Sequence, residues 1–155
     1  MNASFQGADT ADTRYSRVGV ADARTVARIR NEFGRWLRTH LELTEEQFSD
    51  VVLAVNEALT NSAEFAYRTF PEAGTVSIDA QYSSATGSLT VVVVDYGAWN
   101  EGDPPHRSHT RGRGIQLMRA LADLAVIERG SEGTVVQMRF DHCAAVSDSS
   151  ALSEA

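Results

Sequence analysis

The sequence predicts a two-layer α/β sandwich, in which helices cover one face of a mixed, mostly antiparallel sheet. Three observations indicate this fold class. Amphipathic helical patterns follow Asp22 and Thr44. Strand patterns then come in pairs, at residues 76–94 and 125–140. The order strand, helix, helix, strand, strand, helix, strand, strand lacks the regular strand–helix alternation of a doubly wound fold.

Composition, net charge and cysteine content exclude several classes of protein. The 155 residues suffice for one domain with a substantial core, and 43% hydrophobic with 23% charged residues is typical of soluble globular proteins. A net charge of -7 argues against a general nucleic-acid binder. The single cysteine, Cys143, excludes an intrachain disulfide and fits a reducing compartment. No segment resembles a signal peptide, and the longest apolar run, residues 89–94, is too short to span a bilayer. We expect a cytoplasmic protein that contacts neither nucleic acid nor membrane directly.

The chain begins with a small, polar stretch, residues 1–13, which we predict to be a disordered tail. Residues 15–20 predict a short edge strand. Asp22 can cap a helix that ends near His40. The apolar residues of this helix recur at helical spacing and should face the core: Val26, Ile29, Phe33, Trp36 and Leu37.

A second helix follows a capping box formed by Thr44 and Gln47, and it must stop before Pro71. At 100° per residue one arc forms its core face, namely Val51, Val55, Ala58, Leu59, Ser62, Phe65 and Ala66. Glu57 and Asn61 are four residues apart, so they share one stripe at the border of this arc. A partly desolvated carboxylate and amide there need a partner or a ligand. Taken alone, the pair also fits an ordinary half-exposed helix.

The second half of the chain is richer in strand patterns. Residues 76–82 alternate apolar with polar side chains, which predicts a strand with one buried face. Residues 83–88 form a turn cluster. The continuous apolar run at residues 89–94 predicts a central strand covered on both sides or nearly so.

Residues 98–113 show little periodicity, and a loop of this length in a compact domain is usually functional or mobile. A helix opens after it, and strands at residues 125–129 and 134–140 follow, joined by a glycine-containing turn. Residues 142–155 predict a flexible tail. The folded domain is therefore expected to span residues 14–141.

Two short motifs could hold a ligand. Asp95, at the end of a buried strand, could accept a hydrogen bond from an exocyclic amine, and Gly97 would let the backbone approach a flat ring. Gly112 and Gly114 open a helix, where converging N–H groups and the helix dipole favour phosphate; Arg111 and Arg113 could add charge-assisted bonds. Each motif has a simpler explanation, an Asx turn that ends a strand in the first case and a tight turn before a helix in the second.

Other candidates are weaker. His106 and His109 could bind a metal in principle, but solvated loop histidines are the simpler interpretation. Thr134, after Gly133, is an ordinary strand-forming residue when considered alone.

The order and spacing of the motifs carry more information than any one of them. They are Glu57-x-x-x-Asn61 on a helix, Asp95-x-Gly97 after a strand, Gly112-x-Gly114 at a helix start and Gly133-Thr134 at a strand start. This series resembles the histidine-kinase-like ATPase superfamily with the Bergerat fold. The segments at residues 56–61 and 111–123 are similar to its anti-sigma factor serine kinases. The resemblance covers roughly residues 15–140.

The resemblance implies a role for each matching residue. Asn61 would ligate Mg²⁺ that bridges ATP phosphates, and Glu57 would be the general base toward a partner serine or a water. Asp95 would hold the adenine amino group, with Thr134 completing the adenine contacts.

The glycines Gly97, Gly112 and Gly114 would keep the backbone close to the ring and the phosphates. Residues 98–111 would form the lid over ATP.

The resemblance therefore implies an ATP-binding serine/threonine kinase that acts as a bacterial anti-sigma factor. It would phosphorylate an anti-sigma factor antagonist of the STAS type, sequester a sigma factor and regulate transcription, and such proteins often form homodimers. Phe65 stands where many of these kinases carry histidine, and Gln116 replaces a frequent third glycine. The alternative hypothesis is a regulatory module that binds ATP and a partner without kinase activity.

Overall fold

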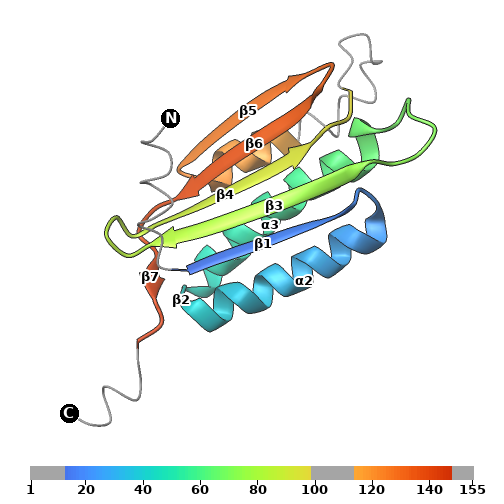
Figure 1. The fold of residues 1–155 in the computed structure, drawn as a ribbon. Helices are drawn as coiled ribbons and strands as arrows, with labels where there is room; N and C mark the ends of the chain where they lie inside the picture. Colours follow the sequence, from blue (N-terminus) through green and yellow to red (C-terminus); the bar gives the residue numbers. More distant parts are fainter. Residues whose placement is uncertain (1–12, 99–113, 148–155) are drawn as a thin grey trace.

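The fold is a five-stranded sheet with its helices on one face, as the computed structural model shows for residues 13–98 and 114–147 (Figure 1). The strands are β1 (Thr13–Val20), β3 (Thr75–Ser83), β4 (Ser88–Asp95), β5 (Leu124–Gly130) and β6 (Gly133–Phe140). They lie in the order β1-β3-β4-β6-β5, and every neighbouring pair is antiparallel. The two-layer prediction is confirmed. The expected mixture with parallel strands is wrong for the strands that the structure describes.

The two long helices begin where their capping residues predict. In α2 (Ala23–His40), Asp22 accepts a 2.8 Å hydrogen bond from the backbone N–H of Thr25. In α3 (Glu45–Asn61), Thr44 and Gln47 form both bonds of the capping box, at 2.9 and 3.0 Å. Each bond satisfies a backbone donor that the first helical turn leaves unpaired.

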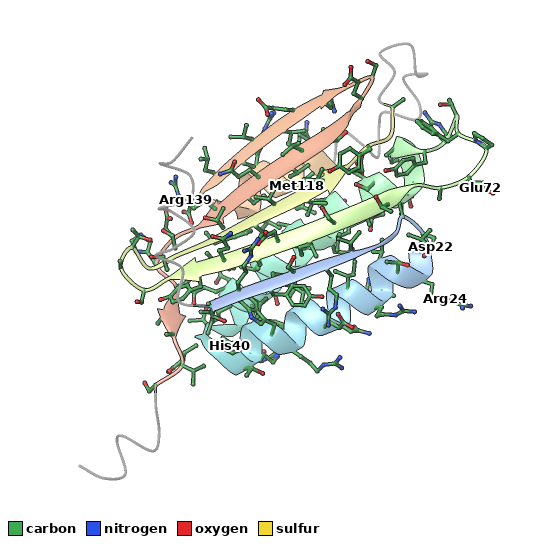
Figure 2. The ribbon with its side chains drawn as sticks, in the orientation of Figure 1. Asp22, Arg24, His40, Glu72, Met118 and Arg139 are labelled. Atoms are coloured by element: carbon green, nitrogen blue, oxygen red, sulfur yellow. The ribbon has the colours of Figure 1, made fainter. Side chains whose placement is uncertain are left out.

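The core lies between this helical layer and the sheet. The largest fully buried side chains come from both layers: Phe33, Leu37, Leu59, Ile78, Leu89, Met118 and Met138. Met118, labelled in Figure 2, belongs to a third helical segment at residues 114–121. The predicted core face of α2 is buried as expected, except that Trp36 is only partly buried against the core.

The valine run of β4 differs from its prediction. Burial alternates along the strand, so Leu89, Val91 and Val93 are buried whereas Val92 and Val94 are only half-buried. The predicted cover on both sides is therefore wrong. Because all helices pack on one face, the β-branched residues of the other face serve the strand conformation and not a second core.

The end of the second helix also departs from its prediction. After Asn61 the chain continues as the π-helix η1 (Ser62–Ala66), whose hydrogen bonds span five residues in place of four. The wider turn changes the direction of the side chains that follow. Phe65, predicted on the core face, is consequently only half-buried, while Ser62 and Ala66 are buried.

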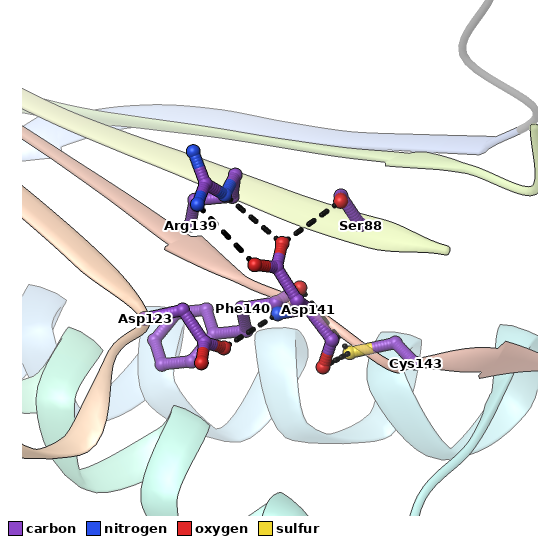
Figure 3. Close-up of polar contacts among 6 residues, drawn as sticks. All are labelled: Ser88, Asp123, Arg139, Phe140, Asp141 and Cys143. Carbon is purple, nitrogen blue, oxygen red and sulfur yellow. Dashed lines mark hydrogen bonds and ion pairs between the residues drawn. The ribbon is translucent and has the colours of Figure 1, made fainter. Parts of the chain in front are cut away.

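Two very short strands were not predicted. Strand β2 (Leu41–Glu42) pairs antiparallel with β7 (Ala144–Ala145), within the region from residue 142 onward that we had assigned to a tail. A cluster of hydrogen bonds holds the preceding residues (Figure 3). Asp141 accepts bonds from Arg139 and Ser88, which keep the pKa of its carboxyl below the ordinary value. The fold therefore extends past residue 141.

A tyrosine fastens the part of the sheet that lies beside the end of η1. The Tyr67 hydroxyl donates to the carbonyl of Thr75 at 2.6 Å and accepts from the N–H of Tyr96 at 2.8 Å. It thus joins the start of β3 to the end of β4. Gly74 makes room for the ring, since a Cβ there would lie 2.4 Å from it.

We predict that Tyr67→Phe lowers the free energy of unfolding by about 1 kcal/mol, because the carbonyl of Thr75 and the N–H of Tyr96 lose their partner at a partly buried position. Urea unfolding measures this difference. The control is Tyr96→Phe, because the Tyr96 side chain is 67% exposed. Equal stability of the two variants would contradict the fastening role.

Candidate functional site

A small pocket, of about 10 Å³, lies between the end of α3, the helical segment at residues 114–121, the end of β4 and the start of β6. Its wall is mainly apolar, with polar groups on one side. The lining residues are Ala58, Asn61, Ser62, Asp95, Ile115, Met118, Ile127, Thr134 and Val136. An apolar pocket with a few convergent polar groups is the usual form of a small-molecule site. Three of the predicted site residues meet here: Asn61, Asp95 and Thr134.

Asp95 is the buried acid of this pocket, with an exposed fraction of 3%. Its Oδ1 accepts the N–H of Gly97 at 3.1 Å, which is an Asx turn that ends β4. Its Oδ2 accepts the hydroxyl of Ser62 at 2.6 Å. Each carboxylate oxygen can accept a second hydrogen bond. The turn predicted as the simpler explanation is therefore present, and the carboxylate keeps acceptor capacity beyond it.

Thr134 lies beside this acid because the sheet register pairs it with Asp95. Paired residues of antiparallel strands project from the same face, so both side chains reach the pocket. The residue before Thr134 must be glycine. Gly133 has φ +139°, and a Cβ there would lie 2.3 Å from the carbonyl oxygen of Asp95.

Glu57 and Asn61 lie close to Gly114, the first described residue of the helical segment at residues 114–121. A Cβ on Gly114 would lie 2.9 Å from Oε1 of Glu57 and 3.4 Å from Nδ2 of Asn61. The absent side chain thus lets this helix start approach the polar stripe of α3. Glu57 itself does not line the pocket but stands next to it, one turn before Asn61. Burial, followed by the negative charge of Glu64, raises the pKa of Glu57 above its ordinary value.

Gly97 is predicted to let the backbone approach a ring. In the structure, close packing against η1 explains why this residue is glycine. A Cβ there would lie 2.0 Å from the carbonyl oxygen of Ala66, the last residue of η1. That same oxygen accepts the N–H of Ala98 at 2.7 Å. The glycine therefore holds the end of β4 against the π-helix.

Several predicted residues lie outside the described residues: Arg111, Gly112, Arg113, His106, His109 and most of the expected lid. Sequence reasoning placed Ser62 on the core face but missed its bond to Asp95. The signal was available, because a hydroxyl on a core face needs a partner. Within residues 13–98 and 114–147, no group of three or more His, Cys, Asp or Glu residues could hold a metal ion.

A model of the histidine kinase-like ATPase domain matches residues 19–140. The chain belongs to this family. The match contains each of the four motifs, and it confirms the superfamily that their order and spacing predicted. No helix in the part of this ATPase domain that the structure describes is long and apolar enough to cross a membrane.

A solved structure shares the fold of this ATPase domain. The structure of the RsbU and RsbW domains of Rv1364c from Mycobacterium tuberculosis aligns with a TM-score of 0.63 at 19% identity. The alignment covers 88% of this chain and 34% of that one, so our chain spans about a third of that protein's length. The histidine kinase domain of a blue-light activated histidine kinase from Erythrobacter litoralis EL346 aligns with a TM-score of 0.46 at 24% identity, covering 61% and 44% of the two chains.

We predict that Ser62→Ala destabilises the domain by about 1–3 kcal/mol, because Oδ2 of the buried Asp95 loses its donor. The measurement is urea unfolding of the isolated protein. Ser49→Ala, on the exposed side of α3, is the matched control and should be close to neutral. If the two changes cost the same, the bond between Ser62 and Asp95 contributes nothing to stability.

Proposed function

We propose that this domain binds Mg²⁺-ATP and transfers the terminal phosphoryl group to a serine or threonine of a partner protein. The observation that carries the proposal is the pocket in which a buried, hydrogen-bonded Asp95 meets Asn61, Thr134 and a set of apolar side chains. Glu57 lies next to this pocket. A flat ring with a polar edge suits the chemistry of this lining, and the pocket must widen from about 10 Å³ to admit it.

Asp95 and Thr134 are the residues that we propose bind the adenine ring. Asp95 accepts the hydrogen bond of the exocyclic amine with a free lone pair, while Ser62 and Gly97 hold its two oxygens in place. Thr134 adds a hydroxyl at the same edge. Met118 and Ile127 supply apolar surface to the ring faces.

The phosphate end rests on Asn61 and the helix start at Gly114. When bound, Mg²⁺ would supply positive charge against the phosphates of ATP. The amide oxygen of Asn61 is the kind of ligand this ion takes, and one or two protein ligands suffice because water and phosphate complete its shell. Gly114 brings the backbone close to the same stripe, so backbone N–H groups there could receive phosphate oxygens.

In the transfer step Glu57 acts as general base. Its carboxylate accepts the proton of the attacking hydroxyl while the hydroxyl oxygen bonds to phosphorus and ADP leaves with the former bridging oxygen. A partly buried glutamate with a raised pKa is a stronger base than an exposed one.

The biological role that we propose is that of an anti-sigma factor. The acceptor is then an anti-sigma factor antagonist, and the competing partner is a sigma factor. The supports are the family membership and the resemblance of residues 56–61 and 111–123 to the serine kinases of this kind.

A second candidate is an ATP-binding regulatory module without transfer activity. Phe65 favours it, because an apolar ring on η1 stands where many such kinases carry histidine. The guanidinium of Arg68 lies 5.5 Å from the centre of this ring. Under the second candidate, the pocket binds ATP but Glu57 does not act as a general base.

Paired substitutions separate the two candidates. Glu57→Gln should bind Mg²⁺-ATP nearly as well as the wild type but lose about 10²–10⁴-fold in transfer rate, the usual contribution of a general base. Asp95→Asn should weaken nucleotide binding first. Calorimetric titration measures binding, and radiolabelled transfer to the antagonist measures the reaction. Glu128→Gln, exposed on β5, is the control and should change neither quantity.

Two outcomes would count against the proposal. Wild-type transfer in Glu57→Gln would show that Glu57 is not the base. Binding of Mg²⁺-ATP without transfer to the antagonist in the wild type would favour the regulatory module.

The rate of transfer should also depend on pH through Glu57. The base must be deprotonated, so activity falls as pH drops through its pKa. Because that pKa is raised, the acid midpoint should lie above the ordinary glutamate value of 4.5. Glu64→Gln removes a negative neighbour and should move the midpoint of kcat/KM to lower pH. Glu46→Gln, in the first turn of α3, should leave the midpoint in place. A midpoint that Glu64→Gln leaves unchanged would contradict the assignment.

A further inference from the structure

Helix α2 is basic although the whole chain carries a net charge of -7. It has one acid, Glu32, against five arginines: Arg24, Arg28, Arg30, Arg35 and Arg38. Glu32 is engaged elsewhere, since its Oε1 accepts hydrogen bonds from Tyr15 and Arg17 of β1. The outer side of α2 is therefore a local region of positive charge on an acidic protein.

Three of these arginines border a shallow groove between α2 and α3. The lining residues are Arg30, Asn31, Gly34, Arg35 and Arg38 from α2 and Phe48 and Val52 from α3. Its volume is about 310 Å³, and its floor combines an aromatic ring, a valine and a glycine. The groove thus has an apolar floor with basic walls.

The charges of these arginines are weakly used by the fold. Arg30 donates to the neutral amide oxygen of Asn56 at 3.1 Å. Arg38 lies over the Phe48 ring at 3.7 Å and approaches Glu45 at 3.6 Å, but both side chains of that ion pair are more than half exposed. Exposed pairs of this kind add little stability. Arg35 lies close enough to Glu32 to help lower the pKa of that carboxyl, although Tyr15 and Arg17 are its stronger partners. The groove arginines therefore keep capacity to bind the carboxylates of another molecule.

Gly34 is the feature that the fold does not explain. It stands inside α2, where glycine is the poorest helix former after proline. A Cβ there would meet only Cζ of Phe48, at 3.6 Å, which is ordinary contact. An alanine would fit, so the packing of the chain does not require glycine. What the glycine provides is an open floor between the arginines.

We propose that this groove binds an acidic amphipathic helix of a partner protein. Apolar side chains at helical spacing fill the floor over Gly34, Phe48 and Val52, and flanking carboxylates meet the arginine walls. The rest of this acidic surface repels such a helix, so long-range attraction guides it to α2.

The groove and the pocket lie on opposite sides of α3. Phe48 and Val52 are nearly one turn apart and face α2, whereas Asn61 is nine residues beyond Val52 and points about 180° away. Occupation of the groove therefore leaves the pocket open. The proposal does not depend on nucleotide binding or on transfer activity.

The test is titration of the full ¹⁵N-labelled chain with a designed peptide of about 18 residues, long enough to form a helix, with leucines on one face and glutamates elsewhere. The amides of residues 30–38 and 48–52 should shift, and affinity should fall with added salt. A lysine-for-glutamate peptide should not bind. A peptide of the same composition with scattered leucines should bind more weakly.

Two pairs of variants locate the binding. Arg35→Glu should lower the affinity for the glutamate–leucine peptide by about tenfold or more. Arg24→Glu makes the same charge change on the same helix but outside the groove, so it should have little effect on this affinity. Gly34→Leu should fill the floor and weaken binding similarly. Gly34→Ala should fold and melt at a higher temperature than the wild type, which shows that the position tolerates a side chain. If Gly34→Leu does not fold, the arginine pair alone decides.

Four outcomes would overturn the proposal. The first is absence of binding, and the second is equal affinity in Arg35→Glu and Arg24→Glu. The third is displacement of the peptide by a single-stranded oligonucleotide at similar concentration, which would indicate a nucleic-acid ligand. The fourth is a concentration-dependent shift of the groove amides without peptide, which would indicate a second copy of the chain.

Discussion

The pocket of this ATPase domain depends on a single buried bond, the one between the Ser62 hydroxyl and the Asp95 carboxylate. A carboxylate with 3% exposure is costly unless donors surround it. The donors come from two different elements, η1 and the end of β4. The bond therefore fixes the angle between the helical layer and the sheet where the ligand is expected to enter. Gly97 and Ala66 complete this junction by bringing the two backbones together.

Helix α3 serves the domain through three differently composed faces. One face fills the core with Val51, Val55 and Leu59. A second carries Glu57 and Asn61 beside the pocket, and a third forms the floor of the basic groove. Ser62, the first residue of η1, follows directly and is buried where α-helical spacing predicts it. Its hydroxyl thus reaches Asp95 on the sheet while Asn61 stays on its stripe.

Much of the fold could be predicted from the sequence because the relevant signals are local. The Asp22 cap and the Thr44 capping box each involve residues three apart, and the alternation of residues 76–82 depends on the strand itself. The order of motifs identified the family, which residues 19–140 confirm. The assigned roles of Glu57, Asn61, Asp95 and Thr134 remain predictions.

The features that were missed depend on contacts between distant parts of the chain. Ser62 and Asp95 are 33 residues apart, and β2 meets β7 across most of the sequence. The continuous valines of β4 suggested cover on both sides, because propensity alone does not tell whether a second layer exists. A helical wheel assumes one period throughout, so it misplaced Phe65 once the period changed.

The seam between β4 and β6 has one more consequence. It joins two hairpins, β3–β4 and β5–β6, each of which can form from chain neighbours, whereas the seam itself must close a long loop. Asp95 and Thr134 are the last pair of this seam. A ligand bound by both side chains would stabilise the pairing of β4 with β6, so its concentration would govern how often the two hairpins separate. Ligand occupancy would then control the lifetime of the folded protein as well as its activity.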